Sequence, residues 1–305
     1  MARTHDRTIT TRASIVLGVL AAGGLLFAAG SASAQGCTRE ILRDTAEDYI
    51  AAQESADSTK LHMGLWVSYN EQMADSTLST GVISKPLKID FHREIFDTTS
   101  CSLFSEVVIT DPAHPYVIGA IIQNGGGPGV SGPDVIGSFN VVVTDKSNGW
   151  LFNPANTKKY SEAENWALIP AAERDSRQVI QAAADAYLDL FNDKNAKVPW
   201  GTPCARLEGG AYTSNAQPGS LNPTDSCNVG VPSGVPIVDR TYVIDPELGA
   251  VAVLSHFGKD KEPDFHTFRI EHGKIKYIHT ITACVNKPNC GLANTPPAPV
   301  QAASR

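Results

Sequence analysis

The sequence predicts an α+β fold made of two tandem units, each with an N-terminal helix packed on a curved antiparallel sheet. The first observation is a helical pattern that occurs twice. Residues 41–50 and residues 179–188 both carry apolar residues at i, i+4 and i+8, with alanine and tyrosine on one face. The second observation is that β-branched and aromatic runs, broken by turn residues, follow each of these segments. A switch from helical to strand periodicity that occurs twice indicates an internal repeat.

The spacing of further matches supports this repeat. The two helical segments lie 138 residues apart, whereas Trp66 matches Trp200 at a spacing of 134. Asp111-Pro112 matches Asp245-Pro246 at the same spacing of 134. One shorter connection in the second unit accounts for the difference.

The predicted strands divide between the two units, and the turn at Glu271-His272-Gly273-Lys274 predicts a hairpin near the end. The strands are expected at 86–94, 103–110, 116–122 and 139–144 in the first unit, and at 205–207, 237–244, 251–257, 265–271 and 274–282 in the second. The expected boundaries are a signal peptide at 1–34, a first domain at 37–160, a linker at 161–176, a second domain at 177–284 and a disordered Pro/Ala tail at 285–305.

The first 34 residues have the features of a secretory signal. Arg3, Arg7 and Arg12 precede an apolar run at 13–29, and Ala32-Ser33-Ala34 supplies the small residues of a cleavage site. An uncleaved anchor helix is the alternative, but the run is short and rich in glycine. We therefore expect a secreted or periplasmic protein that has no membrane attachment after cleavage.

All six cysteines lie after this segment. An even number of cysteines in an exported chain favours disulfides over free thiols. Six cysteines can pair in several ways, and the sequence does not choose among them, although nearness favours Cys37 with Cys101, Cys204 with Cys227, and Cys284 with Cys290. There is neither a CxxC pair nor an HExxH pattern, so we expect no structural metal.

The charge pattern excludes several classes of partner. The net charge is −7, and basic residues neither form a block nor alternate with aromatic residues, so neither nucleic acid nor an anionic membrane is expected as a partner. The glycine-rich segment 125–133 lacks the GKS/T ending of a phosphate-binding loop. It is expected to be an enlarged hairpin loop.

Side chains alternate between the two faces of a strand, and this alternation, here called strand parity, gives the first candidates for catalysis. Along residues 274–282, Lys274 and Lys276 are expected to face water. An imidazole and a phenol two residues apart on the opposite face would suit a general base and an oxyanion donor. The alternative is a structural histidine that packs beside a tyrosine. The residues expected to share this inward face are Ile275, Tyr277, His279 and Ile281.

Further candidates follow from the same argument. Arg206 and Glu208 share a strand face, where they either bind an anionic substrate or form a surface ion pair. In the first unit Asp90 and His92 share a face as candidates for catalysis and binding, although a solvated sheet edge explains them equally well. The remaining candidates are Glu106 as a catalytic carboxylate, opposite Arg240 at the spacing of 134, with Arg240, Tyr242 and Trp200 as substrate-binding side chains.

Several segments resemble a family of exported fungal and bacterial proteins that is catalogued as a domain of unknown function. These segments are KPLKID at 85–90, DTTSC at 97–101, DPAHPYVIG at 111–119, VPWGTPCARLEGG at 198–210 and CNVGVPSG at 227–234. The helix-first unit closed by long antiparallel strands also resembles the cone-shaped fold of nuclear-transport-factor-2-like and SnoaL-like proteins. The two units are accordingly expected to be tandem cone-shaped domains.

The resemblance implies a pocket for a small, partly hydrophobic molecule. It also implies a lyase, isomerase or dehydratase that needs no cofactor and acts on an aromatic or polyketide-like substrate, as a fold-level analogy. The alternative is a non-catalytic exported protein that binds a ligand or a partner. The sequence is compatible with a homo-oligomer.

Overall fold

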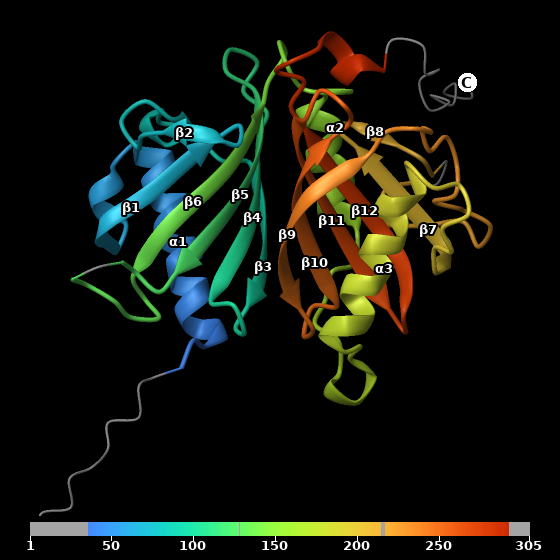
Figure 1. Ribbon diagram of the computed structural model, residues 1–305, viewed down its shortest axis with the longest axis horizontal. Helices are drawn as coiled ribbons and strands as arrows, with labels where there is room; N and C mark the ends of the chain where they lie inside the picture. The colour runs from blue at the N-terminus through green and yellow to red at the C-terminus, as the bar shows by residue number, and fades with distance from the viewer. Residues whose placement is uncertain (1–35, 128, 215–216, 293–305) are drawn as a thin grey trace, which may run out of the picture. The chain divides into compact units, whose positions relative to one another are not determined.

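The computed structural model describes residues 36–292, except residue 128 and residues 215–216. The predicted signal peptide and residues 293–305 of the predicted tail lie outside the described part of the chain. The described residues form an α+β fold with two six-stranded mixed sheets, each preceded by a helix (Figure 1). The predicted fold class is confirmed.

The chain contains the same order of elements twice. The first repeat comprises α1 (Arg39–Ser55), β1 (Met63–Glu71), β2 (Ala74–Ser76), β3 (Phe91–Asp97), β4 (Ser102–Ile109), β5 (Tyr116–Asn124) and β6 (Ile136–Thr144), with short helices η1 (Ser58–Lys60) and η2 (Val82–Ser84). After α2 (Pro154–Ala163) and η3 (Ala171–Glu173), the second repeat comprises α3 (Arg177–Leu190), β7 (Trp200–Glu208), β8 (Ala211–Tyr212), β9 (Ile237–Asp245), β10 (Ala250–Phe257), β11 (Glu262–Glu271) and β12 (Lys274–Thr282), followed by η4 (Pro288–Gly291).

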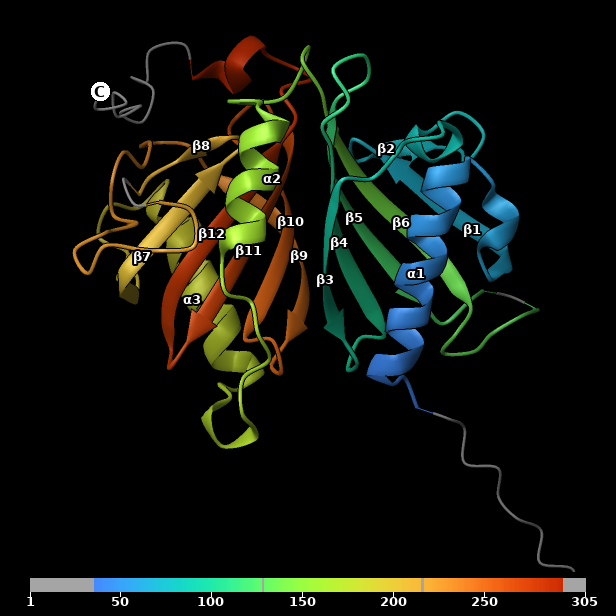
Figure 2. The same cartoon turned by 180° about the vertical axis from the view of Figure 1, so that it is seen from behind.

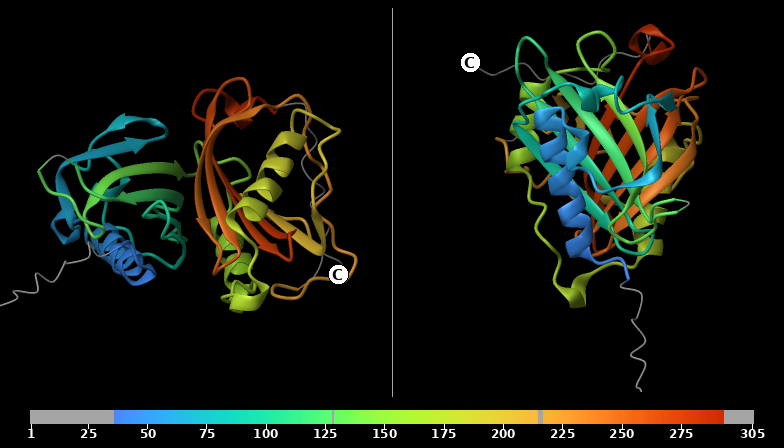
Figure 3. Two further views of the ribbon diagram at one scale, coloured as in Figure 1. Left: turned by 60° about the horizontal axis from the view of Figure 1, so that its bottom comes forward. Right: turned by 90° about the vertical axis from the view of Figure 1, so that its left-hand side faces the viewer.

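The two main helices begin in the same way. The side chain of Thr38 accepts a hydrogen bond from the backbone N–H of Ile41, at 3.2 Å, and caps α1. The side chain of Ser176 caps α3 by accepting from the N–H of Val179, at 3.4 Å. Each helix packs on one face of its own sheet, α1 as seen in Figure 2 and α3 across the curve of its sheet in Figure 3.

The strand order is also the same in the two sheets: β2-β1-β6-β5-β4-β3 and β8-β7-β12-β11-β10-β9. One pair in each sheet is parallel, β1 with β6 and β7 with β12, and the other pairs are antiparallel. The sheets are therefore mixed rather than wholly antiparallel as predicted. In each repeat, the first long strand lies beside the last one, and the long connection between them permits parallel pairing.

Strand register shows which residues of the two repeats correspond. β1 has three extra residues relative to β6 between Met63 and Ser68, and β7 has three extra residues relative to β12 between Trp200 and Ala205. This shared irregularity places Trp200 in register with Met63. The predicted match of Trp200 with Trp66 is therefore wrong by three positions.

The hairpins β3–β4 and β9–β10 correspond at a spacing of 148, because Asp97 pairs with Ser102 where Asp245 pairs with Ala250. Asp245 therefore corresponds to Asp97, and its predicted match with Asp111 is wrong. The short matching dipeptides misled the alignment, since they lie at the ends of different strands.

The same register corrects the predicted opposition of Glu106 and Arg240. Glu106 on β4 corresponds to Leu254 on β10, whereas Arg240 lies on the neighbouring strand β9. The connections between strands differ in length at several places, so that no single spacing relates the two repeats.

The sheet faces not covered by α1 and α3 pack against each other in a third apolar core. The ring centroids of Phe104 and Phe265 lie 4.9 Å apart in this core. Gly119 is needed there, because a Cβ atom at this position would lie 2.6 Å from the Phe265 ring. The two repeats thus bury their sheets against each other within one chain.

Two reciprocal ion pairs fasten the repeats at corresponding positions. Arg39, the first residue of α1, donates to both carboxylate oxygens of Asp245 at 2.8 Å. Arg177, the first residue of α3, donates to Asp97 at 2.6 and 2.8 Å. Both aspartates are buried, so each repeat supplies the cation for a carboxylate of the other.

Three disulfides are present, and they are the pairs that nearness in sequence favoured: Cys37–Cys101, Cys204–Cys227 and Cys284–Cys290. Such bonds persist in oxidising compartments outside the cytoplasm, which agrees with an extracellular protein. Among the described residues, no helix is long and apolar enough to cross a membrane.

The predicted linker and tail both contain ordered residues. Glu164, in the expected linker, is buried, and Trp166 packs beside it. After β12, the backbone N–H groups of residues 285–287 all donate to the carboxylate of Glu262. The expected tail therefore does not begin directly after Cys284.

Candidate functional site

The interior of the second repeat, between α3 and its sheet, contains ionisable side chains in a space that is otherwise apolar. Alternate residues of β7, β11 and β12 point toward α3, because side chains alternate between the faces of a strand. Arg206, Glu208, Asp264 and His266 lie on this face and are each at most 3% exposed. Buried charges are costly unless they are paired.

Arg206 and Glu208 form an ion pair in this interior. Nε of Arg206 lies 2.8 Å from Oε1 of Glu208, although its N–H bond is not directed at that oxygen, so the contact is ionic. The guanidinium also donates to the carbonyl of Cys227 at 3.0 Å. Tyr187 and Thr280 donate to the two carboxylate oxygens at 3.4 and 3.1 Å. The surface position considered from the sequence is therefore wrong.

Asp264 and His266 form a second polar group. Nδ1 of His266 lies 2.6 Å from Oδ2 of Asp264. Because a carboxylate only accepts, Nδ1 carries the hydrogen of this bond. Ser255 donates to Oδ2 at 3.1 Å and Thr282 donates to Oδ1 at 2.6 Å, which fixes the orientation of the aspartate.

The other ring nitrogen of His266 has no hydrogen-bond partner among the described residues. Aromatic rings surround it instead: the centroids of Tyr187, Phe191 and Phe268 lie 5.7, 6.0 and 6.1 Å from that of the imidazole. Burial raises the pKa of Tyr187, so its hydroxyl keeps its proton and is a donor. The site thus holds one free basic nitrogen in apolar surroundings.

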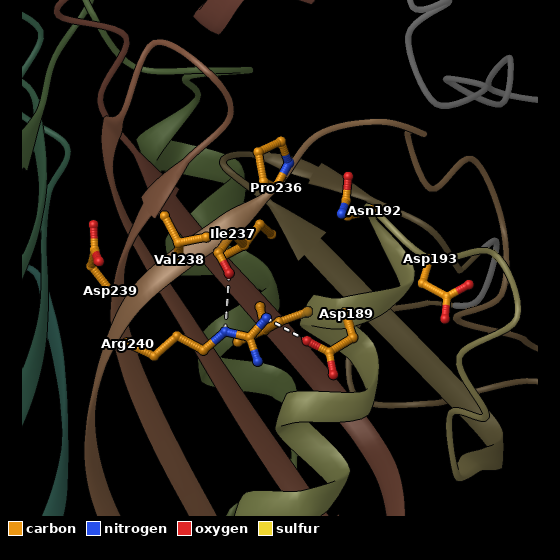
Figure 4. Close-up of a pocket in the computed structure, with 9 residues that line it drawn as sticks. Asp189, Asn192, Asp193, Pro236, Ile237, Val238, Asp239 and Arg240 are labelled. Carbon is orange, nitrogen blue, oxygen red and sulfur yellow. Dashed lines mark hydrogen bonds and ion pairs between the residues drawn. The ribbon is translucent and has the colours of Figure 1, made fainter.

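A hollow of about 490 Å³ lies at the outer edge of this interior, between the end of α3 and the start of β9 (Figure 4). Arg240 and Asp189 lie on its rim, and Leu188 and Ile237 line its floor. Arg240 is fully engaged there. Its guanidinium contacts Asp185 at 2.9 Å and Asp189 at 2.7 Å, and its Nε donates to the carbonyl of Ile237 at 3.1 Å.

The candidates predicted on β12 lie on the opposite side of the sheet from this interior. An irregularity between Ile275 and Tyr277 reverses the parity that the sequence suggested. Ile275 packs under α3, whereas Tyr277 and His279 face the first repeat. The predicted common face of Ile275 and His279 is therefore wrong, because a bulge shifts side chains to the other face.

His279 is the centre of a buried cluster between the repeats. Nε2 lies 2.7 Å from Oε2 of Glu164, and Nδ1 lies 3.3 Å from both carboxylate oxygens of Glu106. Arg93 lies 3.7 Å from Glu106 and stacks over the ring of Trp166. Two cations and two carboxylates meet here, and all but Arg93 are buried.

The charges in this cluster are mutually stabilised. Burial by itself lowers the pKa of an imidazole, but Glu164 and Glu106 outweigh that effect and raise the pKa of His279 to about 9. Burial by itself raises the pKa of a carboxyl, but His279 and Arg93 hold the pKa of Glu106 below its ordinary value. An imidazolium with both nitrogens bonded cannot accept a proton, so this geometry does not support a general base at His279.

The other predicted residues are spread over the molecule. Trp200 packs edge-on against Tyr187, with centroids 5.7 Å apart, and so borders the interior. Tyr242 donates to Asp185 at 2.7 Å and, with Arg240, ties β9 to α3. Their roles as substrate-binding residues stay predictions.

Asp90 and His92 lie near the surface of the first repeat. Asp90 accepts from the backbone and side chain of Thr110, both at 2.7 Å, and these bonds lower its pKa. His92 is half-exposed and lies 2.7 Å from Glu94, whose hydrogen bond raises the pKa of the imidazole. Among the described residues, no hydrogen bond or ion pair joins Asp90 or His92 to Glu106 or Tyr277.

Sequence reasoning did not select His266, Asp264, Ser255, Thr282 or Glu164 as site residues. The signal for Asp264 was present: Asp264 and His266 alternate with Phe265 and Thr267, so both fall on one face of a strand. No comparable signal exists for Glu164, since it reaches His279 from a segment between elements. Within the described residues, no group of three or more histidine, cysteine, aspartate or glutamate side chains is arranged so that it could hold a metal ion.

Residues 173–282 match a protein family described as "Domain of unknown function (DUF8021)". The matched range begins just before α3 and ends with β12, so that it covers the second repeat. The two helix-and-sheet units are consistent with a nuclear-transport-factor-2-like character. No curated protein matches the chain.

Proposed function

We propose that the second repeat is an acid–base active site, and that the protein is a lyase, isomerase or dehydratase for a small, partly hydrophobic molecule. The observation that carries this proposal is the pair Asp264–His266. It lies buried under α3, and Nε2 of His266 has no hydrogen-bond partner among the described residues. A buried histidine nitrogen that is left free, while a carboxylate holds the other nitrogen, is suited to remove a proton.

The proposed reaction begins when Nε2 takes a proton from a carbon next to a carbonyl group. The electron pair of the broken C–H bond forms a C=C bond, and the carbonyl oxygen becomes an enolate oxygen. In an isomerase, the imidazolium returns the proton to another carbon. In a dehydratase, it gives the proton to a departing hydroxyl group, which leaves as water. Every such step uses only the proton that the imidazole first accepted, so no cofactor is needed.

Asp264 would hold Nδ1–H in place and stabilise the imidazolium that forms at His266. The Tyr187 ring adjoins His266, and its hydroxyl would donate to a developing oxyanion by turning its single hydrogen away from Glu208. Arg206 and Glu208 would orient Tyr187 through the 3.4 Å bond from its hydroxyl. The proposal therefore moves the base from His279 to His266. It gives Arg206 and Glu208 a positioning role in place of the predicted binding of an anionic substrate.

We also propose that the chain is exported by its N-terminal segment and cut after Ala34, and that it acts outside the cytoplasm as a member of the exported family that its segments resemble. The disulfides support this location.

The test compares His266→Asn with His62→Asn. Both histidines contact a carboxylate through Nδ1, but His62 is exposed, 3.2 Å from Asp134 in the first repeat. Each protein is incubated with small metabolites extracted from culture medium, and loss of substrate is followed by mass spectrometry. We expect His266→Asn to lower turnover by roughly 10²–10⁴-fold, whereas His62→Asn leaves it unchanged.

Full turnover by a folded His266→Asn protein would overturn the proposed base. A wild-type protein that retains a metabolite in equilibrium dialysis but never converts it would instead establish the non-catalytic carrier. Circular dichroism of each variant distinguishes loss of turnover from loss of fold.

A further inference from the structure

The floor of the hollow between α3 and β9 belongs to the interior of the second repeat. Leu188 and Ile237 line the hollow, and both are members of the apolar core that surrounds His266. His266 itself is 1% exposed, so a ligand can reach it only if something moves. The hollow is where the surface comes close to that core.

Phe191 does not itself line the hollow, but it lies in the chain between Asp189 and Asn192, which do, and its ring packs on His266. It is the C-cap residue of α3 and is 4% exposed. Its ring centroid lies 6.0 Å from that of His266 and 6.0 Å from that of Phe257. Phe257 pairs with Ile237 on the neighbouring strand, which lines the hollow. Phe191 therefore connects the segment that lines the hollow with the imidazole.

Arg240 and Tyr242 tie β9 to α3, but among the described residues only three hydrogen bonds join the chain after α3 to the segment before β9. The carbonyl of Phe191 accepts from the N–H of Val235 at 3.1 Å, and Lys194 donates to the carbonyls of Val231 and Pro232. Lys194 and these carbonyls lie near the surface. A corner at a helix end that is held by few hydrogen bonds can open locally without unfolding of the sheet.

The rim of the hollow is acidic. Asp189, Asp193 and Asp239 lie on it with one cation, Arg240, which Asp185 and Asp189 already neutralise. The last turn of α3 contains no basic residue, so its carbonyl end adds to the negative potential. Lys261 faces Asp239 at 3.5 Å, and Lys194, next to Asp193, donates to the carbonyls of Val231 and Pro232. With Asp185, four carboxylates thus lie around the hollow with three lysine or arginine cations.

We propose that the hollow is the entrance to the active site, that Phe191 closes it, and that it admits neutral or cationic molecules in preference to anions. This inference rests on the proposed function of the second repeat. It narrows the substrate class to small molecules without a carboxylate or phosphate group, because the acidic rim repels anions before they reach His266.

The test uses alkylation of His266 by iodoacetamide, which is neutral, and by iodoacetate, which is an anion of similar size. The free lone pair of Nε2 displaces iodide in both cases, and peptide mass mapping locates the product. No described cysteine is free to compete. His279, with both nitrogens bonded, is an internal control that should not react.

We expect Phe191→Ala to raise the rate of His266 alkylation by iodoacetamide about tenfold or more, because the closed corner then opens more often. Phe268→Ala is the matched control, since it removes a ring that also packs on His266 but lies on β11, away from the segment that lines the hollow. If Phe191→Ala fails to fold, Phe191→Leu replaces it in this test, because leucine keeps most of the side-chain volume. Equal rates in the Phe191 and Phe268 variants would overturn the entrance.

The preference for neutral or cationic molecules is tested by comparing the rates at which iodoacetate and iodoacetamide alkylate His266. In Phe191→Ala, iodoacetate should react several-fold more slowly with His266 than iodoacetamide does, after correction for their rates with free histidine. Asp193→Lys in the same background should narrow that ratio, since it reverses one rim charge. An unchanged ratio would overturn the charge preference. If His266 becomes accessible yet His266→Asn keeps full turnover, the entrance stands and the proposed function fails.

Discussion

The interiors of the two repeats have corresponding backbone positions, but four of these positions are apolar in the first repeat and polar in the second. Strand register places four residues under α1 in correspondence with four residues under α3. In the first repeat all four are apolar, and in the second they form the Asp264–His266 group with its two hydroxyl donors. The corresponding pairs are Val107 and Ser255, Ile118 and Asp264, Ala120 and His266, and Val143 and Thr282.

This difference distinguishes the side chains that the fold requires from the polar side chains that it only accommodates. The first repeat shows that aliphatic side chains fill these positions, so the polar set of the second repeat is not needed to form the sheet. Burying such groups costs free energy even when they are hydrogen-bonded. A carboxylate is common to both, since Glu71 corresponds to Glu208. In the first repeat, however, Glu71 accepts from Tyr69 and from the backbone of Val82, which is a structural use.

The largest predicted effect concerns the sheet faces between the repeats, where His279 corresponds to Asn140. We expect His279→Asn to lower the free energy of unfolding by about 3–5 kcal/mol, because Glu106 and Glu164 lose their shared buried cation. Asn140→Ala is the matched control and should cost less than about 1 kcal/mol. Urea denaturation measures both. Equal losses would show that the cluster is not specific to the second repeat.

The same cluster predicts how stability depends on pH. The pKa of His279 is raised to about 9 in the folded protein, against about 6.5 in an unfolded chain. Its contribution is therefore complete below about pH 6.5 and is lost as the pH rises toward 9, with a total on the order of 3 kcal/mol. Denaturation at pH 6 and pH 9 should show this loss in the wild type. The His279→Asn protein should lack it, and an equal loss there would assign the effect to other groups.

The outline of the fold could be predicted from the sequence because it depends on local periodicity. Two amphipathic helices and nine of the strands are recognisable from the spacing of apolar residues alone. β1 was missed, since it does not alternate: Leu65 and Trp66 are both exposed. Strand parity succeeded where strands are regular, as at Arg206 and Glu208, and failed at the bulge before Tyr277.

The sites were harder to predict, because they depend on contacts between distant segments. His279 and Glu106 were both selected, but as members of separate pockets, whereas 173 residues of sequence separate two groups in direct contact. Glu164 contacts His279 from a segment that belongs to no strand. Such contacts depend on how the two sheets pack against each other, and local sequence patterns do not predict this packing.

Transplanting the first interior into the second tests the comparison directly. We expect the combined change Ser255→Val, Asp264→Ile, His266→Ala and Thr282→Val to raise the free energy of unfolding by about 1–4 kcal/mol, since well-packed apolar residues often outperform buried polar groups. Thermal and urea denaturation measure it, and the variant should have lost turnover. A folded variant that is less stable than the wild type would show that the polar set serves the fold.

The smallest predicted effect concerns the two corresponding tyrosines of α1 and α3. The hydroxyl of Tyr49 is buried with no hydrogen-bond partner among the described residues, whereas that of Tyr187 donates to Glu208 at 3.4 Å. Removing an unsatisfied group relieves its desolvation penalty, so Tyr49→Phe should leave stability unchanged or raise it by about 1 kcal/mol. Tyr187→Phe should lower it by about 1 kcal/mol, since Glu208 loses a donor in a buried site. Measured in parallel by urea denaturation, the two changes should differ in sign. A loss of the same size at both positions would mean that the α1 interior also holds a polar partner for its tyrosine, and that the two interiors are more alike than their residues indicate.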